Sequence, residues 1–428
     1  MQKIIKKTPN FKGEIKVAAD KSISHRAVMF TALAEGESVI NNFLLAEDTI
    51  ATLNCFRCLG INIAQNNQQL VVQGQGLNGL LEPTRILECG NSGTTMRLLT
   101  GLLSGVNFFS ILSGDDSLNK RPMSRVIKPL TSMGANIMAR GNGVYAPLAI
   151  KGHNLTGVTY HTPMASAQVK SALILAGLYA DSPTSIIEAK KSRDHTERML
   201  SALGADIVET DLTVTIAPQP QLRPQTINVP NDISSAAFFI VAASIIKDAQ
   251  ILIKNVGINP TRAGILEVLY SMGANIKKEN EMIVGGEAVA DLIVTSSNLK
   301  SVEIKGDIIP RLIDELPILA VAMAVAEGTS LVKDAAELRV KETDRIKAIC
   351  TELGKMGVSI RETADGFSIE GAYDKLKGTI VDSWGDHRIA MSLAIAGLVA
   401  DGETIINNAG VVDISFPEFW EKIRQLTN

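Results

Sequence analysis

Short polar phrases stand at the expected starts of six apolar helices, and their side chains are the first candidates for chemistry. They occupy residues 20–26, 91–97, 166–170, 231–235, 313–315 and 385–388. Asp, Asn and Ser at such positions are ordinary helix caps. Lys21 and Arg388 are less ordinary, because a cation in the first turn opposes the helix dipole. A bound phosphate or carboxylate would remove this penalty, since helix N-termini bind anions.

Further basic phrases lie between these helices, at residues 120–125, 192–195, 259–262 and 339–345. Any single Arg is most often a solvated surface charge. Recurrence of these phrases at element ends favours a cationic cleft that binds anions. The i, i+4 spacing of Lys341 and Arg345 predicts that both lie on one helix face, next to Glu342. Such a face could hold an anion beside a carboxyl group that moves a proton.

Two repeated phrases indicate the elements that position these side chains. In the first, an amphipathic helix ends at a glycine and a strand follows, with the glycine at residues 60, 134, 204, 273 and 357. In the second, an Ala-rich helix ends before β-branched residues, near positions 34, 103, 179, 246, 326 and 400. Helices that are apolar nearly all round are buried, whereas alternating strands face water on one side.

The six copies divide the 428 residues into units of about 71 residues (428/6). Each unit is predicted to contain a strand, a buried helix, a strand, an amphipathic helix and further strands. Six units are too many for one core, so three and three is the natural grouping. The sequence therefore predicts an α/β (α+β) fold in which sheets and amphipathic helices surround buried helices.

The balance of charged and aromatic residues excludes several classes of protein. Lys and Arg number 42 against 45 Asp and Glu, which gives a net charge of −3, and aromatic residues make up 4%. Nucleic-acid binding through a positive field or through stacking platforms is therefore disfavoured. No apolar run reaches the roughly 18–20 residues that span a bilayer, so no membrane partner is expected. Residues 1–11 are basic but lack the apolar core of a signal peptide.

The cysteines and histidines do not suggest a metal site. Cys55 and Cys58 form a C-x-x-C inside a helical pattern, without a second pair or a nearby His. Packing is therefore the better interpretation of both thiols. The five His residues are scattered, and no glycine loop typical of nucleotide-binding proteins occurs. The sequence predicts a reduced, cytoplasmic protein without a metal site.

Taken together, six phrases resemble those of the 5-enolpyruvylshikimate-3-phosphate synthases. They lie in order at residues 20–26, 90–94, 121–123, 166–168, 339–345 and 386–388, and the similarity extends from about residue 13 to 420. The resemblance implies a two-domain inside-out fold with six βαβαββ repeats, three in each domain. It implies a discontinuous domain of residues 1–19 and 233–428, an inserted domain of residues 20–232, and an active site in the cleft between them.

The resemblance also implies a reaction. The enolpyruvyl group of phosphoenolpyruvate would move to the 5-hydroxyl of shikimate 3-phosphate by addition and elimination, with release of phosphate, on the shikimate pathway to chorismate and aromatic amino acids. Both substrates are polyanions, which accounts for a cationic cleft in a slightly acidic protein. The family similarity implies no metal or redox cofactor. We expect a monomer, because no long exposed apolar seam is evident.

The matching positions imply a set of site residues. The shikimate 3-phosphate contacts would be Lys21, Ser22, Arg26, Ser166, Ala167, Gln168, Arg193, Asp314 and Lys341. The phosphoenolpyruvate contacts would be Lys21, Gly93, Arg121, Gln168, Glu342, Arg345 and Arg388. Lys21, Asp314 and Glu342 resemble the proton-transfer group, with Asp314 near the 5-hydroxyl and the other two at the methylene and phosphate ends.

Some positions depart from the family's pattern or suggest a subgroup. Residues 411–417 lack the Lys that better-known members carry before the C-terminal Phe-Pro, so the resemblance leaves one phosphoenolpyruvate contact unassigned. The phrases at 121–125, 166–170 and 259–262 resemble the subgroup often tolerant of glyphosate. Gly93, however, is retained where a bulkier Ala would exclude that inhibitor.

Two alternatives stay in view. The sister transferase acts on a UDP-amino sugar and carries a Cys in the loop that corresponds to residues 114–121, where this chain has none. A non-catalytic anion-binding relative would have lost part of the charged set, whereas Lys21, Asp314, Glu342, Arg345 and Arg388 are all retained.

Overall fold

The chain folds into two compact units. The computed structural model describes residues 1–428, apart from the side chain of Asp374. Unit 1 comprises Met1–Ala18, Pro230–Ile283 and Ala288–Asn428. Unit 2 comprises Ala19–Val229 together with Val284–Glu287. Among the described helices, none combines the length and the hydropathy needed to cross a membrane.

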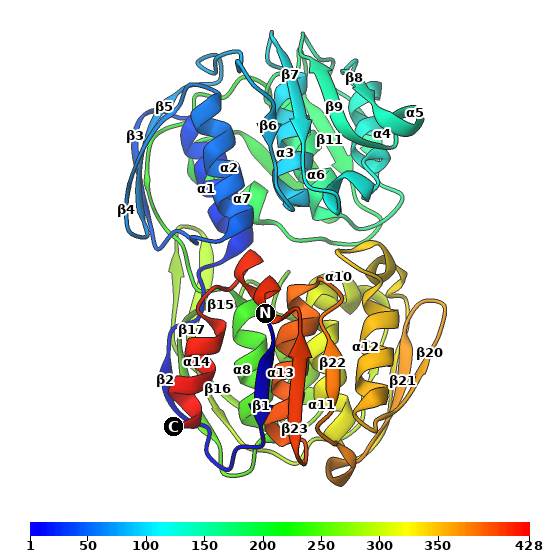
Figure 1. Cartoon of the computed structure of the whole chain (residues 1–428). Helices are drawn as coiled ribbons and strands as arrows, with labels where there is room; N and C mark the ends of the chain where they lie inside the picture. The colour runs from blue at the N-terminus through cyan, green and yellow to red at the C-terminus, as the bar shows by residue number, and fades with distance from the viewer. The chain divides into compact units, whose positions relative to one another are not determined.

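Three buried helices form the centre of unit 2 (Figure 1): α1 (Lys21–Leu33), α3 (Gly93–Ser104) and α6 (Ala167–Gly177). Nearly every residue of α1 and α3 is buried, whatever its direction around the helix. An apolar or small side chain at almost every position allows this, because no polar face is left to seek water.

Sheets and amphipathic helices surround these helices. The sheet orders are β14-β3-β5-β4, β6-β7-β9-β8 and β10-β11-β13-β12. In each order the first pair is parallel and the others are antiparallel. The strands are β3 (Glu35–Asn41), β4 (Asn62–Asn66), β5 (Gln69–Gln75), β6 (Leu87–Glu88), β7 (Phe109–Ser113), β8 (Asn136–Ala139), β9 (Tyr145–Lys151), β10 (Thr159–His161), β11 (Thr184–Ile187), β12 (Ile207–Thr210), β13 (Thr213–Ile216) and β14 (Thr226–Asn228). The helices outside them are α2 (Glu47–Cys58), α4 (Ser124–Ser132) and α7 (His195–Ala202), with a short turn α5 (Arg140–Gly143).

Unit 1 repeats this plan around α8 (Ile233–Ile245), α11 (Leu316–Val325) and α13 (His387–Val399). All residues of α8 and α13 are buried. The sheet orders are β16-β17-β15-β2, β18-β19-β21-β20 and β1-β23-β22. The strands are β1 (Lys3–Lys6), β2 (Lys12–Ile15), β15 (Gln250–Gly257), β16 (Asn275–Val284), β17 (Glu287–Thr295), β18 (Glu303–Ile304), β19 (Gly328–Val332), β20 (Ser359–Glu362), β21 (Phe367–Gly371), β22 (Ile380–Asp382) and β23 (Glu403–Asn407). The remaining helices are α9 (Gly264–Ser271), α10 (Ile309–Leu312), α12 (Arg345–Lys355) and α14 (Phe419–Thr427).

The predicted arrangement of sheets around buried helices is confirmed, and so is the glycine signal. Glycines 60, 134, 204, 273 and 357 have φ values between 87° and 99°. Each follows the end of an outer helix, where a left-handed residue terminates the helical hydrogen bonding. The same local chemistry therefore recurs in five of the six units.

The sixth unit departs from the repeat. Its sheet has three strands, and β1 from the N-terminus pairs antiparallel with β23 in place of a hairpin. After β23 the chain turns into a 3-10 segment (Ala409–Ile414) and then α14. Strand β1 at the N-terminal end thus completes the sixth sheet, which the sequence pattern did not indicate, whereas α14 at the C-terminal end contacts β2 of the β16-β17-β15-β2 sheet.

The prediction that Lys341 and Arg345 share a helix face is wrong. A 3-10 segment covers Ala336–Val340, and α12 begins only at Arg345. Asp344 is the N-cap, and its carboxylate accepts a hydrogen bond from the Lys347 N–H at 3.0 Å. Because a capping Asp starts the helix after itself, Lys341 and Glu342 lie in the loop that precedes α12.

Candidate active site

Arg345 is the centre of the charged cluster in unit 1. Its side chain is 1% exposed. Its Nε lies 2.7 Å from Asp386, its Nη1 lies 3.1 Å from Asp314 and its Nη2 lies 2.5 Å from Glu342. Burial would lower the pKa of this guanidinium, but the three carboxylates outweigh that effect and raise its pKa above the usual value. One buried cation therefore fixes the positions of both predicted proton-transfer carboxylates.

Arg388 and Lys341 complete this cluster. The Arg388 Nη1 donates to the backbone oxygen of Asp314 at 3.0 Å and lies 3.5 Å from the carboxylate of Glu315. The Lys341 Nζ lies 3.7 Å from Asp314. Arg388 occupies the first turn of α13, where Asp386 caps its backbone N–H. The carboxylates offset the unfavourable interaction of this cation with the helix dipole.

In unit 2, the start of α3 is joined to the start of α6. The Arg97 Nη1 donates to the side-chain oxygen of Gln168 at 2.8 Å, and the Gln168 amide donates to Thr94 at 3.1 Å. Arg121 reaches the same region, with its Nη2 2.5 Å from the side-chain oxygen of Asn91. The structure thus brings Gly93, Arg121 and Gln168 together near the starts of α3 and α6.

The start of α1 carries two cationic residues, Lys21 and Arg26, in different surroundings. The Lys21 Nζ is paired with Asp48 at 2.9 Å, which offsets its charge in the first helical turn. The Arg26 guanidinium is buried and donates to Thr196 at 2.7 Å and to Ser171 at 2.8 Å. Burial lowers the pKa of Arg26 to about 10, so the side chain stays cationic at neutral pH. Its backbone-directed bond to the Ser22 oxygen, at 3.0 Å, ties it to the first turn of α1.

His25 is neutral in the folded protein. Its Nδ1 lies 2.7 Å from the Thr52 hydroxyl, which in turn lies 2.6 Å from the Thr95 hydroxyl. Burial, and then the charges of Lys21 and Arg26, lower the pKa of His25 well below 6.5. This chain of hydroxyl groups joins α1, α2 and α3, so the imidazole is a structural link between them.

The burial of His25 predicts a pH-dependent stability. In the unfolded chain the His25 imidazole takes up a proton as the pH falls below about 6.5, whereas in the folded protein it stays neutral. The free energy of unfolding therefore decreases below this pH, by up to about 1.4 kcal/mol per pH unit. Urea unfolding should therefore show that wild type loses about 1 kcal/mol more than His25→Gln between pH 7 and pH 5.5. Equal losses in the two proteins would contradict this expectation.

Lys170 is the centre of a second buried charge cluster. Its fully buried Nζ lies 2.8 Å from Glu188 and 2.6 Å from Glu197. Burial alone would lower the pKa of Lys170, but the charges of Glu197 and Glu188 outweigh it and raise that pKa. Burial raises the pKa of Glu197, and Lys170 offsets only part of the rise. Ser192 also donates to Glu188, which anchors the loop just before Arg193.

The predicted site residues fall into two sets. Unit 2 holds Lys21, Ser22, Arg26, Gly93, Arg121, Ser166, Ala167, Gln168 and Arg193. Unit 1 holds Asp314, Lys341, Glu342, Arg345 and Arg388. In unit 2, Ser166 caps α6, Ala167 is its first residue, and the charge of Arg193 acts on Arg26.

Sequence reasoning did not assign several residues that organise these sets. Arg97, Asp48 and Asp386 contact the predicted residues directly. The sequence did contain a signal for Lys170, because a cation inside an apolar helix needs buried partners of opposite charge. No sequence signal pointed to the partners themselves, which lie 18 and 27 positions away.

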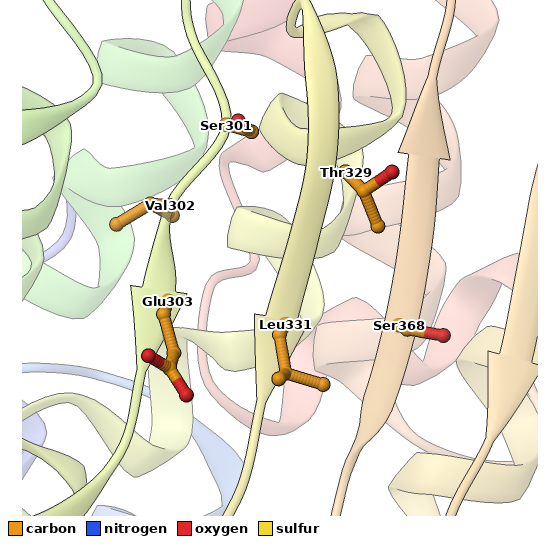
Figure 2. Close-up of a pocket in the computed structure, with 6 residues that line it drawn as sticks. All are labelled: Ser301, Val302, Glu303, Thr329, Leu331 and Ser368. Carbon is orange, nitrogen blue, oxygen red and sulfur yellow. The ribbon is translucent and has the colours of Figure 1, made fainter.

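Two hollows on unit 1 are separate from these charged residues. One, of about 450 Å³, crosses neighbouring strands β18, β19 and β21, and Figure 2 shows its side chains spread along them. Glu303, its charged residue, is paired with Lys305 and Lys333. The other, of about 780 Å³, is lined by Ile245 and Val325 at the C-terminal ends of α8 and α11. The charged cluster instead lies at the N-terminal starts of α11, α12 and α13.

Comparisons with known proteins agree over the whole chain. Residues 5–423 match the family described as EPSP synthase (3-phosphoshikimate 1-carboxyvinyltransferase). A 3-phosphoshikimate 1-carboxyvinyltransferase of Syntrophomonas wolfei subsp. wolfei is 59% identical, with both chains covered completely. One from Synechocystis sp. is 54% identical over 97% of this chain and 93% of that relative.

Comparison of the fold with solved structures identifies the same family as comparison of the sequence. A solved structure of EPSP synthase from Acinetobacter baumannii superposes with a TM-score of 0.89 and 44% identity, covering 99% of this chain and 98% of the other. A likeness of this extent includes both units and the elements that carry the charged residues. This chain is therefore a transferase that belongs to the EPSP synthase family.

Proposed function

We propose that the chain transfers the enolpyruvyl group of phosphoenolpyruvate to the 5-hydroxyl of shikimate 3-phosphate and releases phosphate. The observation that carries this proposal is the buried Arg345, which holds Asp314 and Glu342 on one guanidinium. Two carboxyl groups fixed beside several cations suit a reaction that binds anions and moves protons. Membership of the family supports the same reaction.

The two substrates would share residues from both sets. We assign shikimate 3-phosphate to Lys21, Ser22, Arg26, Ser166, Ala167, Gln168, Arg193, Asp314 and Lys341. We assign phosphoenolpyruvate to Lys21, Gly93, Arg121, Gln168, Glu342, Arg345 and Arg388. Because the two sets lie in different units, we infer that unit 1 and unit 2 are the two domains of one active site. Arg and Lys side chains suit phosphate and carboxylate groups, which both substrates carry.

The chemistry needs one proton transfer at each reacting end. Asp314 takes the proton of the 5-hydroxyl, whose oxygen then attacks C2 of phosphoenolpyruvate. The electrons of the C2–C3 double bond take a proton at C3, supplied by Glu342, and a tetrahedral ketal forms; Lys21 serves the phosphate end. Elimination then removes a C3 proton, restores the double bond and breaks the C2–O bond to phosphate. Because protons return in the second step, the same carboxyl groups serve both steps.

Phosphate release tests the proposal directly. Purified protein with shikimate 3-phosphate and phosphoenolpyruvate should release one phosphate for each enolpyruvyl product, and omission of either substrate should abolish release. Release with a UDP-amino sugar in place of shikimate 3-phosphate would instead identify the sister activity. Binding of either anion without any release would identify a non-catalytic relative.

We also infer that the protein works as a monomer in the cytoplasm. Its four cysteines are free thiols, and a reducing compartment keeps thiols in that state. Sedimentation equilibrium with and without both substrates tests the monomer. A stable dimer in either condition would contradict it.

Gly93→Ala is expected to weaken phosphoenolpyruvate binding. A methyl group at this position would lie 2.5 Å from the Arg97 Nη1, so Arg97 must move, and we expect its bond to Gln168 to break. Loss of a hydrogen bond that involves a charged group should raise the KM for phosphoenolpyruvate about tenfold. Gly354→Ala is the matched control, because its methyl meets only Ile360 at 3.9 Å. An unchanged KM for phosphoenolpyruvate in the Gly93 variant would show that the Arg97 side chain can move without weakening binding.

A further inference from the structure

The turn that precedes α13 has an unusual backbone. It runs over residues 382–386, between the end of β22 and His387, and we call it the Trp384 turn. Trp384 has φ 55° and Gly385 has φ 69°. A bulky aromatic residue in the left-handed region is a conformational outlier, which persists only where its surroundings hold it. Such strained positions cluster at functional sites.

Glu352 on α12 holds this turn. Its carboxylate is fully buried and accepts the Trp384 indole N–H at 2.7 Å and the backbone N–H of Asp382 at 3.0 Å. The Lys355 Nζ lies 2.8 and 2.9 Å from its two oxygens and balances its charge. Each oxygen of this buried carboxylate accepts from two donors, which makes Glu352 a rigid anchor for the turn.

The Trp384 turn leads directly into the charged cluster. Its last residue, Asp386, accepts from the Arg345 Nε at 2.7 Å and from the backbone N–H of Arg388 at 2.8 Å. Arg345 and Glu352 both lie on α12, seven residues and about 10 Å apart along the helix axis. Helix α12 therefore holds the turn by bonds on both sides of the two left-handed residues, Trp384 and Gly385.

We propose that Glu352 and Trp384 are positioning residues for phosphoenolpyruvate, acting through Asp386 and Arg388. The indole–carboxylate bond keeps the Trp384 turn in its strained conformation. That conformation sets the direction in which the Arg388 side chain extends from α13. Neither residue needs to touch a substrate for this role. The inference rests on the proposed function, which assigns Arg388 to phosphoenolpyruvate.

The test uses a parent protein with one tryptophan. Trp384 and Trp420 are the two tryptophans of the chain. The buried indole nitrogen of Trp420 has no hydrogen-bond partner among the described residues. Trp420→Phe therefore removes an indole N–H without breaking a bond, and it leaves Trp384 as the sole tryptophan emitter. This parent should keep wild-type kinetics and is the matched control for Trp384→Phe.

Two variants are compared with the parent. Trp384→Phe in the parent removes the indole N–H but keeps an aromatic ring, and it should raise the KM for phosphoenolpyruvate about tenfold. Glu352→Gln in the parent should raise the same KM and shift the Trp384 emission to longer wavelength. The KM for shikimate 3-phosphate should stay within about twofold, and any loss of kcat through the Asp386–Arg345 bond should be smaller than the rise in the KM for phosphoenolpyruvate.

A double-mutant cycle decides whether the two residues act through one bond. The Glu352→Gln, Trp384→Phe pair should be no worse than the stronger single change, since the second substitution has nothing left to break. Additive effects, an equal rise in both KM values, or a loss confined to kcat would each overturn the inference. If Glu352→Gln fails to fold, Trp384→Phe carries the test, because it keeps the Glu352–Lys355 pair.

The outcomes also separate this inference from the proposed function. A parent that releases no phosphate with both substrates would overturn the proposed function, and this inference with it. An active parent with unchanged phosphoenolpyruvate KM in both variants would overturn this inference alone.

Discussion

Asp314→Asn and Glu342→Gln should each lower kcat by about two to four orders of magnitude, with a much smaller effect on either KM. Both changes preserve size and one acceptor oxygen but remove the ability to take a proton. Asp314 contacts Arg345 and Lys341, and Glu342 contacts Arg345, so each carboxylate is held in place rather than free to turn. A loss confined to kcat is the signature of a group that acts in the transition state.

Glu337→Gln is the matched control for these variants. Its carboxylate lies 3.6 Å from the Lys341 Nζ, almost the same distance as that of Asp314, at 3.7 Å. Unlike Asp314 and Glu342, Glu337 is not assigned to either proton transfer. We expect near-normal kcat in this variant. Steady-state rates of phosphate release with each substrate varied in turn make the comparison, and near-normal turnover in the Asp314 or Glu342 variant would refute the assigned roles.

Lys170→Met should destabilise the protein by about 3–5 kcal/mol at pH 7. The substitution keeps a long side chain inside α6 but leaves the carboxylates of Glu188 and Glu197 buried without their cation. An uncompensated buried charge costs far more than the original pair contributes. Lys191→Met is the control, since Lys191 and Glu209 form a partly exposed pair that should contribute at most about 1 kcal/mol.

The pH dependence identifies the cause of this loss. Burial already raises the pKa of the Glu197 carboxyl group, and loss of the opposing Lys170 charge should raise it further. A raised carboxyl pKa means that stability falls as the pH rises through it, so the deficit of Lys170→Met should shrink towards acidic pH. Urea unfolding at pH 5 and pH 7 measures the difference. Addition of Glu188→Gln and Glu197→Gln should restore much of the stability, whereas a pH-independent deficit would indicate lost packing instead.

Helix starts and repeat boundaries were predictable because they depend on nearby residues. Asp20, Ser92 and Ser166 cap their helices through a side chain that reaches three residues ahead. A different local pattern, the i, i+4 spacing, gave the wrong prediction at Arg345. The spacing of Lys341 suggested a continuous helix, but the capping Asp344 lies between them and starts α12 anew.

The partners of the buried charges were beyond sequence reasoning. Asp314 and Asp386 meet Arg345 from 31 and 41 positions away. Which carboxylate pairs with which cation depends on how three helices pack. No local sequence pattern encodes contacts between residues so far apart in the chain. The left-handed Trp384 is a similar case, because nothing about Trp favours this conformation and only its bonds to neighbouring groups keep it there.

By itself, then, the sequence determined the six-unit plan, the buried helices and the types of residue at their starts. These follow from periodicity and capping, which act over a few residues. The tertiary structure alone decided that β1 completes the sixth sheet, that Arg345 binds three carboxylates, and that Glu352 anchors the Trp384 turn. Each of these joins segments distant in sequence, and such contacts become favourable only when the packed core brings the segments together.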